Sequence, residues 1–227
     1  MKAVFDDRQR RHDPQHFLVN GVVGRSPEQP ARIDALAEGA ARAGCAFQPP
    51  ADHGMGPLAA VHTAEYLAFL RSIHDRWTRI EGAAPEVIPN IHPDGRGASY
   101  PKSAVGQAGW HQADTACPIG PHTWDSAYWS AQTAVTAADL VLGGERGAYA
   151  LCRPPGHHAF ADLAGGFCFL SNAAIAAERL RAAGRRPAVL DIDVHHGNGT
   201  QGVFYARGDV LTVSIHADPA RFYPFFW

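Results

Sequence analysis

The sequence predicts a single α/β domain in which helices cover both faces of a mainly parallel β-sheet. Apolar runs of strand length, at residues 148–152, 187–193 and 210–216, alternate with segments of helical spacing. Continuous apolar runs are typical of strands that are buried on both faces, as in parallel sheets. The chain has 227 residues, of which 46% are hydrophobic, so it has enough material for one sizeable core but not for two.

The first half of the chain predicts one strand, two helices and a long loop. Residues 2–5 form a short apolar run suited to an opening strand. Residues 30–44 have helical spacing with a proline near the start and a glycine at the end. Residues 63–80 carry apolar side chains at the spacing of a second buried helix face. Residues 82–109 are rich in Pro, Gly and Asn, which predicts a long loop or insertion of the kind that is often functional or forms oligomer contacts.

The second half alternates more regularly. Helices are expected over residues 124–142, 171–183 and 200–206, with loops at 153–166 and 195–199. When strands and helices alternate in this way, the carboxyl ends of the strands meet at one edge of the sheet, where ligands bind.

Composition excludes several classes of protein. The net charge is −2 and the Lys and Arg residues are dispersed, so no surface for nucleic acid is predicted. No apolar segment suited to a signal peptide or a membrane span is present. Cys45, Cys117, Cys152 and Cys168 are widely spaced, which favours buried thiols over a disulfide or metal role. We therefore expect a cytoplasmic protein.

The thirteen histidines are informative because several follow the predicted strands. His157 and His158 follow the first apolar run, and Asp191, Asp193 and His195 lie at the end of the second. The third run ends in a further histidine. Histidine is the commonest metal ligand and the usual acid or base near neutral pH. This convergence predicts a metal site or an acid/base site at the carboxyl edge of the sheet.

The D-x-D-x-H segment is the most specific of these patterns. In an extended chain Asp191, Asp193 and His195 lie on one face. Asp193 and His195 offer an oxygen and a nitrogen to one Zn²⁺, which needs a third protein ligand from elsewhere, and Asp191 can orient a neighbouring imidazole. Aspartates after strands also cap the following turn, so this pattern alone leaves a structural role open. The His157–His158 pair adds a general base with an electrostatic partner.

Four segments, RPPGHHA, GGFCFLSNAA, LDIDVHHGNGTQ and VSIH, occur in this order and together resemble the histone deacetylase family and its bacterial acetylpolyamine amidohydrolase branch. The first half of the chain is similar more loosely, through VHTAEYLAFL. The resemblance implies a three-layer arginase/deacetylase-type fold. It also implies a zinc-dependent amidohydrolase that removes acetyl or other small acyl groups from acylated amines such as acetylpolyamines or acetyl-lysine.

The resemblance also implies roles for individual residues. Asp193 and His195 match zinc ligands. His158 matches the general base and acid, oriented by Asn198, and His157 matches an electrostatic partner of that base.

Two further features are implied in the same way. Asp191 is the partner of His157, and the backbone from Asp191 to His195, with Ser214 and Ile215, matches a structural potassium site.

The substrate channel is implied by three more residues. Phe167 and Tyr223 match aromatic channel walls, with core packing as the alternative, and Gly166 matches the residue whose carbonyl binds the substrate amide.

The chain also departs from the family pattern. The family's third zinc ligand, an Asp, and its oxyanion-stabilising Tyr belong to a C-terminal third, so we expect a C-terminally truncated member with an incomplete zinc site. Loss of the oxyanion donor alone costs a factor of about 10²–10³ in rate. Phe17 and Val105 stand where the polyamine branch has acidic residues, which leaves Asp114 as the acidic substitute.

Two alternatives to an active deacetylase are therefore retained. The first is a catalytically incomplete remnant that binds acylated amines. The second is an arginase-like ureohydrolase with two manganese ions, although the HHGNGTQ and RPPGHH segments favour the deacetylase. The 82–109 segment resembles an insertion through which the acetylpolyamine branch dimerises, so a homodimer is expected.

Overall fold

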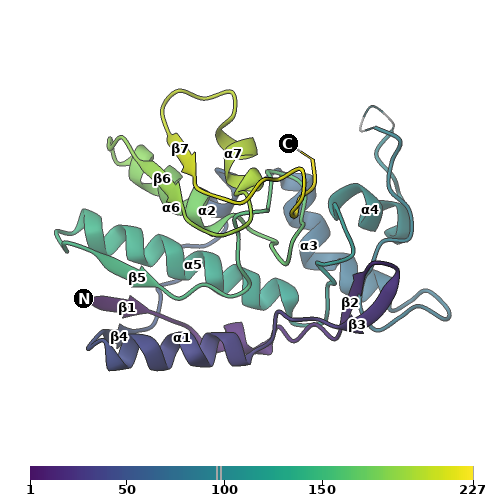
Figure 1. The fold of residues 1–227 in the computed structure, drawn as a ribbon, viewed down its shortest axis with the longest axis horizontal. Helices are drawn as coiled ribbons and strands as arrows, with labels where there is room; N and C mark the ends of the chain where they lie inside the picture. Colours follow the sequence, from purple (N-terminus) through teal and green to yellow (C-terminus); the bar gives the residue numbers. More distant parts are fainter. Residues whose placement is uncertain (96, 98, 227) are drawn as a thin grey trace.

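The strands form two parallel sheets and one antiparallel hairpin in the computed structural model, which describes residues 1–95, 97 and 99–226 (Figure 1). The first sheet has the order β4-β1-β5, the second pairs β6 with β7, and the hairpin pairs β2 with β3. The strands are β1 (Lys2–Val4), β2 (His16–Val19), β3 (Val22–Arg25), β4 (Ala46–Gln48), β5 (Ala148–Ala150), β6 (Ala188–Asp191) and β7 (Leu211–Ser214).

Helices surround these sheets. A short 3₁₀ helix, η1 (Asp7–Arg11), follows β1. The α-helices are α1 (Ala31–Arg42), α2 (Gly56–Ala59), α3 (Ala64–Trp77), α4 (Ala104–His111), α5 (Thr123–Leu142), α6 (Asn172–Ala182) and α7 (Asn198–Phe204). None of the helices in the described ranges combines the length and the hydrophobicity that crossing a membrane would require.

The first sheet lies between two helix layers. Ala3 of β1 is opposite Phe47 of β4 and Tyr149 of β5. Ala3 packs with Ile33 of α1 and with Leu151 after β5, while α5 contacts β1 and β5 (Figure 1). The central strand therefore has no solvent-exposed face, which explains why its sequence is a continuous apolar run. The predicted α/β architecture with a mainly parallel sheet is confirmed.

Helix α3 anchors the larger core cluster. Its N-cap, Thr63, accepts a hydrogen bond from the Tyr66 amide at 3.3 Å, which satisfies one of the free N–H groups of the first turn. Leu67, Leu70 and Ile73 are buried on one face of the helix. Successive members of this set are three residues apart, which places them on the same side of the helix, so the predicted apolar face is confirmed.

The structure corrects several expectations. The predicted 82–109 loop ends in helix α4, which begins at Ala104 behind the N-cap Ser103. Strand β4 and the β2–β3 hairpin were not predicted. Residues 96 and 98 of the predicted loop, and residue 227 at the end of the predicted domain, lie outside the described residues.

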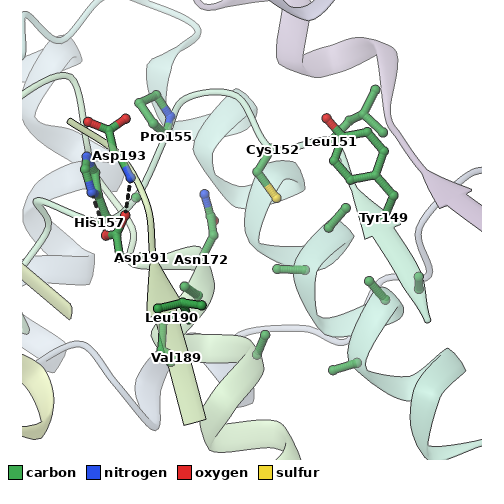
Figure 2. Close-up of a pocket in the computed structure, with 18 of the residues that line it drawn as sticks. Tyr149, Leu151, Cys152, Pro155, His157, Asn172, Val189, Leu190, Asp191 and Asp193 are labelled. Atoms are coloured by element: carbon green, nitrogen blue, oxygen red, sulfur yellow. Dashed lines mark hydrogen bonds and ion pairs between the residues drawn. The ribbon is translucent and has the colours of Figure 1, made fainter. Parts of the chain in front are cut away.

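The strands that end at the predicted site do not all lie side by side. β6 and β7 are in register, with Asp191 opposite Ser214, but β5 belongs to the other sheet. Between β5 and β6 lies an open cavity of about 930 Å³. Figure 2 shows it with β6 on the left, β5 on the right and side chains of the helices between them. We call this cavity, between the chain segments 148–152 and 189–193, the β5–β6 slot.

Candidate active site

The loop after β5 carries two imidazoles, each held by a different partner. His157 Nδ1 donates a hydrogen bond to Asp191 Oδ2 at 2.8 Å, and His158 Nδ1 donates to Asn198 Oδ1 at 2.7 Å. The two ring centroids are 3.9 Å apart. Figure 2 shows the first of these bonds reaching from the loop to the end of β6. Because each Nδ1 carries the proton, each Nε2 is left to accept one.

Gly199 allows helix α7 to pack closely against the loop that carries His157 and His158. A Cβ at this position would overlap the carbonyl carbon of His158 and the backbone of Ala159. The glycine thus lets the start of α7 lie directly on the histidine loop, and Asn198 then reaches His158. The G-N-G sequence is the local reason why this hydrogen bond forms.

Burial sets the charge of the inner histidine. Loss of water around the ring, with a further contribution from neighbouring His157, lowers the pKa of His158 to about 3. The ring is therefore neutral near pH 7, as a general base must be. For Asp191, burial acts to raise the pKa, but hydrogen bonds from His157 and from the Asp193 amide outweigh it and leave the pKa below its usual value.

Asp193 and His195 lie beside these pairs and are more open to solvent. Asp193 Oδ1 lies 3.2 Å from His195 Nδ1 and accepts a hydrogen bond from the His195 amide at 2.8 Å. Their side chains are 49% and 41% exposed. Asp191 also caps the turn, since its Oδ1 accepts from the Asp193 amide at 3.0 Å. Asp191 therefore has the turn-capping role that the sequence left open. The capped turn holds the two candidate ligands, Asp193 and His195, close together.

Asp193 and His195 offer the kinds of ligand atom that zinc binds, but two ligands are fewer than a catalytic zinc ion needs. One oxygen and one nitrogen converge, whereas a catalytic zinc takes three protein ligands. Within the ranges 1–95, 97 and 99–226, no three His, Cys, Asp or Glu side chains gather at metal-binding distance. The predicted ligands Asp193 and His195 are thus brought together as an incomplete set.

Of the three predicted channel residues, Tyr223 and Gly166 lie against His158, while Phe167 lies beside Phe17. Tyr223 packs edge-on to the His158 ring with centroids 4.7 Å apart, and the Phe167 ring lies 5.7 Å from that of Phe17. Gly166 has a φ of 51°, and a Cβ there would overlap the His158 ring. Phe17, which stands at an expected acidic position, therefore packs beside Phe167, a predicted channel residue.

Asp114 has a structural role that was not anticipated. Its Oδ2 accepts hydrogen bonds from the Gly166 amide at 3.0 Å and from the Tyr223 hydroxyl at 2.5 Å. Its Oδ1 accepts from the Ala116 amide at 2.8 Å. One carboxylate thus joins Gly166 and Tyr223, two residues that are predicted to line the substrate channel. Burial, followed by the charge of Asp114, raises the pKa of Tyr223, which keeps its hydroxyl a donor.

The remaining expected residues occupy other places. Ser214 lies between the Gly197 amide, at 3.3 Å, and His216 Nδ1, at 2.8 Å, while the Ile215 amide donates to the Asp191 carbonyl at 2.9 Å. The potassium site around these residues stays a prediction. Val105 lies in α4 and packs against the main core.

Comparisons with known proteins identify the family. Residues 26–226 match the model of the histone deacetylase domain. The chain is 48% identical over 225 residues to an acetylpolyamine amidohydrolase of Burkholderia pseudomallei, covering 99% of this chain and 65% of that protein. It is 44% identical to acetylpolyamine amidohydrolase 1 of Pseudomonas aeruginosa, covering 100% of this chain and 66% of that protein.

A solved structure agrees with these sequence matches. The crystal structure of acetylpolyamine aminohydrolase from Burkholderia pseudomallei superposes with a TM-score of 0.94 at 47% identity, covering 99% of this chain and 66% of that one. The chain thus spans about two thirds of the length of the relatives that it matches. By the family match and by fold, the chain belongs to the histone deacetylase domain family.

Proposed function

We propose that this chain carries the active-site half of a zinc-dependent amidohydrolase that removes acetyl or other small acyl groups from acylated amines. The observation that supports this most directly is the neutral, buried His158, held by Asn198 beside the candidate ligands Asp193 and His195. A bound zinc ion would polarise the amide carbonyl and lower the pKa of a water molecule towards about 7.

The residues of the chain would then move the proton and hold the substrate. His158 accepts a proton at Nε2 and returns it to the leaving amine, while Asn198 fixes the tautomer through Nδ1. His157, bonded to the Asp191 carboxylate, stabilises charge next to that base. Phe167 and Tyr223 exclude water from a narrow apolar path to His158.

The acetylpolyamine class is the substrate that the comparisons favour. The relatives named above are called acetylpolyamine amidohydrolases, and the chain is nearly half identical to one of them. Asp114 contributes a negative charge at the channel wall, although Gly166 and Tyr223 already occupy one of its oxygens. Acetyl-lysine is the competing substrate. The potassium ion, the homodimer and the cytoplasmic location stay predictions.

A binding module for acylated amines is the second candidate. The observation in its favour is the incomplete donor set, with two of the three zinc ligands in the described part of the chain. The arginase-like alternative is disfavoured by the match to the histone deacetylase domain.

Acetate release distinguishes the enzyme from the binding module. A version of the protein extended by the C-terminal third that its relatives have is incubated with zinc and either N-acetylputrescine or an acetyl-lysine peptide. The proposal predicts hydrolysis of the acetylated diamine that is lost in His158→Ala, while the variant keeps its metal. Saturable binding of both compounds without acetate release would favour the binding module. Equal hydrolysis by His158→Ala and the parent protein would contradict the role of His158.

A further inference from the structure

Glu86 is a buried acidic residue outside the candidate active site, in the segment between α3 and α4. Its side chain is only 6% exposed. A carboxylate at this depth is stable where hydrogen bonds replace the water that it has lost. The backbone beside it is fixed, since Val87 is fully buried and exchanges two hydrogen bonds with Ile119. Glu86 is therefore an acceptor held at a defined point of the core.

Two neighbouring residues, where β2 begins, donate three N–H groups to Glu86. The Gln15 amide donates to Oε1 at 2.9 Å, and the His16 amide donates to Oε2 at 3.1 Å. His16 Nδ1 also donates to Oε2, at 2.5 Å. One carboxylate thus fixes both the backbone and the ring of the first residue of the β2–β3 hairpin.

The pairing of the hairpin directs the His16 amide towards Glu86. The Ser26 amide donates to the Gln15 carbonyl at 3.2 Å, so Gln15 and Ser26 form a hydrogen-bonded pair. In an antiparallel ladder such positions alternate with positions whose N–H groups point outward. The His16 amide therefore points away from β3, and Glu86 accepts it there. Residues 18–25 are exposed, and Figure 1 shows the hairpin on the opposite side of the molecule from β1. The hairpin is thus held at its base.

Phe17 connects this base to the candidate active site. Its ring is half-buried and lies 5.7 Å from the ring of Phe167, at an angle of 38°. Successive side chains of a strand point to opposite faces, so Phe17 points away from the side on which His16 meets Glu86. A displacement of His16 therefore moves the Phe17 ring relative to Phe167.

Phe167 depends on such a contact because its backbone is in a disfavoured conformation. Gly165 and Cys168 exchange two backbone hydrogen bonds, at 3.1 and 2.8 Å. Between them φ is 51° at Gly166 and 69° at Phe167. A tight turn with two positive φ values favours glycine at both positions. A non-glycine residue keeps this conformation where its surroundings hold it, and the Phe17 ring is part of those surroundings.

We propose that Glu86 is a positioning residue for the substrate channel, acting through Phe17 on Phe167. The carboxylate holds the base of the hairpin, and the hairpin holds the Phe17 ring against the predicted channel wall. The consequence for catalysis rests on the proposed function. Glu86 should affect the binding of the acylated amine and not the proton transfer, because His158 is held separately by Asn198.

Amide hydrogen exchange of the 227-residue chain tests this role without an activity assay. Glu86→Gln keeps the size of the side chain but leaves one accepting oxygen, so bonds from Gln15 or His16 are lost. We expect these two amides to exchange about tenfold faster or more. The Cys168 amide, which closes the turn around Phe167, should also exchange faster than in the parent protein.

Glu178→Gln is the matched control for this measurement. The Glu178 side chain is 9% exposed, accepts hydrogen bonds from Arg181 and is paired with Arg207. It lies in α6, so its loss should leave exchange at the Cys168 amide unchanged.

A double-mutant cycle distinguishes action through Phe17 from general loosening of the fold. Phe17→Ala removes the ring and leaves the Glu86 bonds, so the Cys168 amide should exchange faster while the His16 amide stays protected. Adding Glu86→Gln to Phe17→Ala should cause no further increase at Cys168. Additive increases would show that Glu86 does not act through this ring.

Steady-state kinetics of the version extended by the C-terminal third then test the consequence for the substrate. Glu86→Gln should raise KM for N-acetylputrescine about tenfold and leave kcat within about twofold, because binding is weakened and the proton transfer is not. Glu178→Gln should leave both constants within about twofold of the parent values.

The outcomes separate this role from the proposed function. Faster exchange confined to Gln15 and His16, an equal increase at Cys168 in Glu178→Gln, or a lower kcat at unchanged KM would overturn the role of Glu86. Absence of hydrolysis in the extended parent protein would contradict the proposed function. Exchange at Cys168 would still decide whether Glu86 positions Phe167.

Discussion

Tyr223 donates its hydroxyl proton to Asp114 across 109 residues of sequence, and the Gly166 amide donates to the same carboxylate oxygen. This pairing joins Tyr223, which packs on the His158 ring, to Gly166, and both residues are predicted to line the substrate channel. Asp114, which the sequence suggests as the acidic substitute of the polyamine branch, therefore also holds these two residues together.

Tyr223→Phe should lower the free energy of unfolding by about 1.5–3 kcal/mol, since a half-buried hydrogen bond to a charged acceptor is lost. Tyr128→Phe is the matched control, because the Tyr128 hydroxyl bonds to Asp52 in an exposed pair and should cost less than about 1 kcal/mol. Urea denaturation of both variants measures the difference. A double-mutant cycle with Asp114→Asn that shows no coupling would contradict the anchor.

Gly199→Ala should destabilise the protein by about 1–3 kcal/mol despite the higher helix propensity of alanine, because the new Cβ meets the backbone of His158 and Ala159. Gly208→Ala is the control, since a Cβ there has no atom within 4 Å, and should change stability by less than about 0.5 kcal/mol. Thermal and urea unfolding measure both. Equal effects at the two positions would show that the contact between α7 and the histidine loop is not tight.

Stability should fall as the pH is lowered below about 6.5. Burial lowers the pKa of His12 to about 3 and that of His62 to about 4, from an ordinary value of 6.5. Between these values the unfolded state binds protons that the folded state does not. The stabilising contribution of each group is therefore complete above pH 6.5 and is lost on acidification, at up to about 1.4 kcal/mol per pH unit.

His62→Gln isolates one of these contributions. His62 Nε2 accepts a hydrogen bond from the Ser171 amide at 3.0 Å, so the variant is less stable at neutral pH but lacks one titrating group. Its unfolding free energy should decline less steeply between pH 6.5 and pH 4.5 than that of the parent protein. Identical slopes would show that His62 does not carry this dependence.

Local patterns in the sequence predicted the helices α1, α3, α5, α6 and α7 and the strands that end at the site, but not η1, α2 or α4. The spacing of Leu67, Leu70 and Ile73 determined the buried face of α3, and the polar residues after the β6 run marked Asp191 and Asp193. The β2–β3 hairpin was not predicted, although the sequence contains an indication of it. Asn20-Gly21 between apolar residues is typical of a tight hairpin turn.

Contacts between distant segments could not be predicted in this way. Strand β4 has three residues, and its identity as a strand depends on pairing with β1, more than forty positions earlier. The β5–β6 slot arises because β5 and β6 belong to different sheets. The order of the two strands along the chain does not indicate what lies between them. The Asp114–Tyr223 hydrogen bond likewise joins two segments that are far apart in the sequence.

Zinc stoichiometry tests the central claim, that Asp193 and His195 form part of a zinc site, most directly. The 227-residue protein is equilibrated with zinc, dialysed and analysed for bound metal. His195→Gln is compared with His92→Gln, which removes an exposed histidine away from the D-x-D-x-H segment. The account predicts weak but measurable zinc retention by the parent chain, and loss of that zinc in His195→Gln but not in His92→Gln. Equal zinc retention by both variants would contradict it.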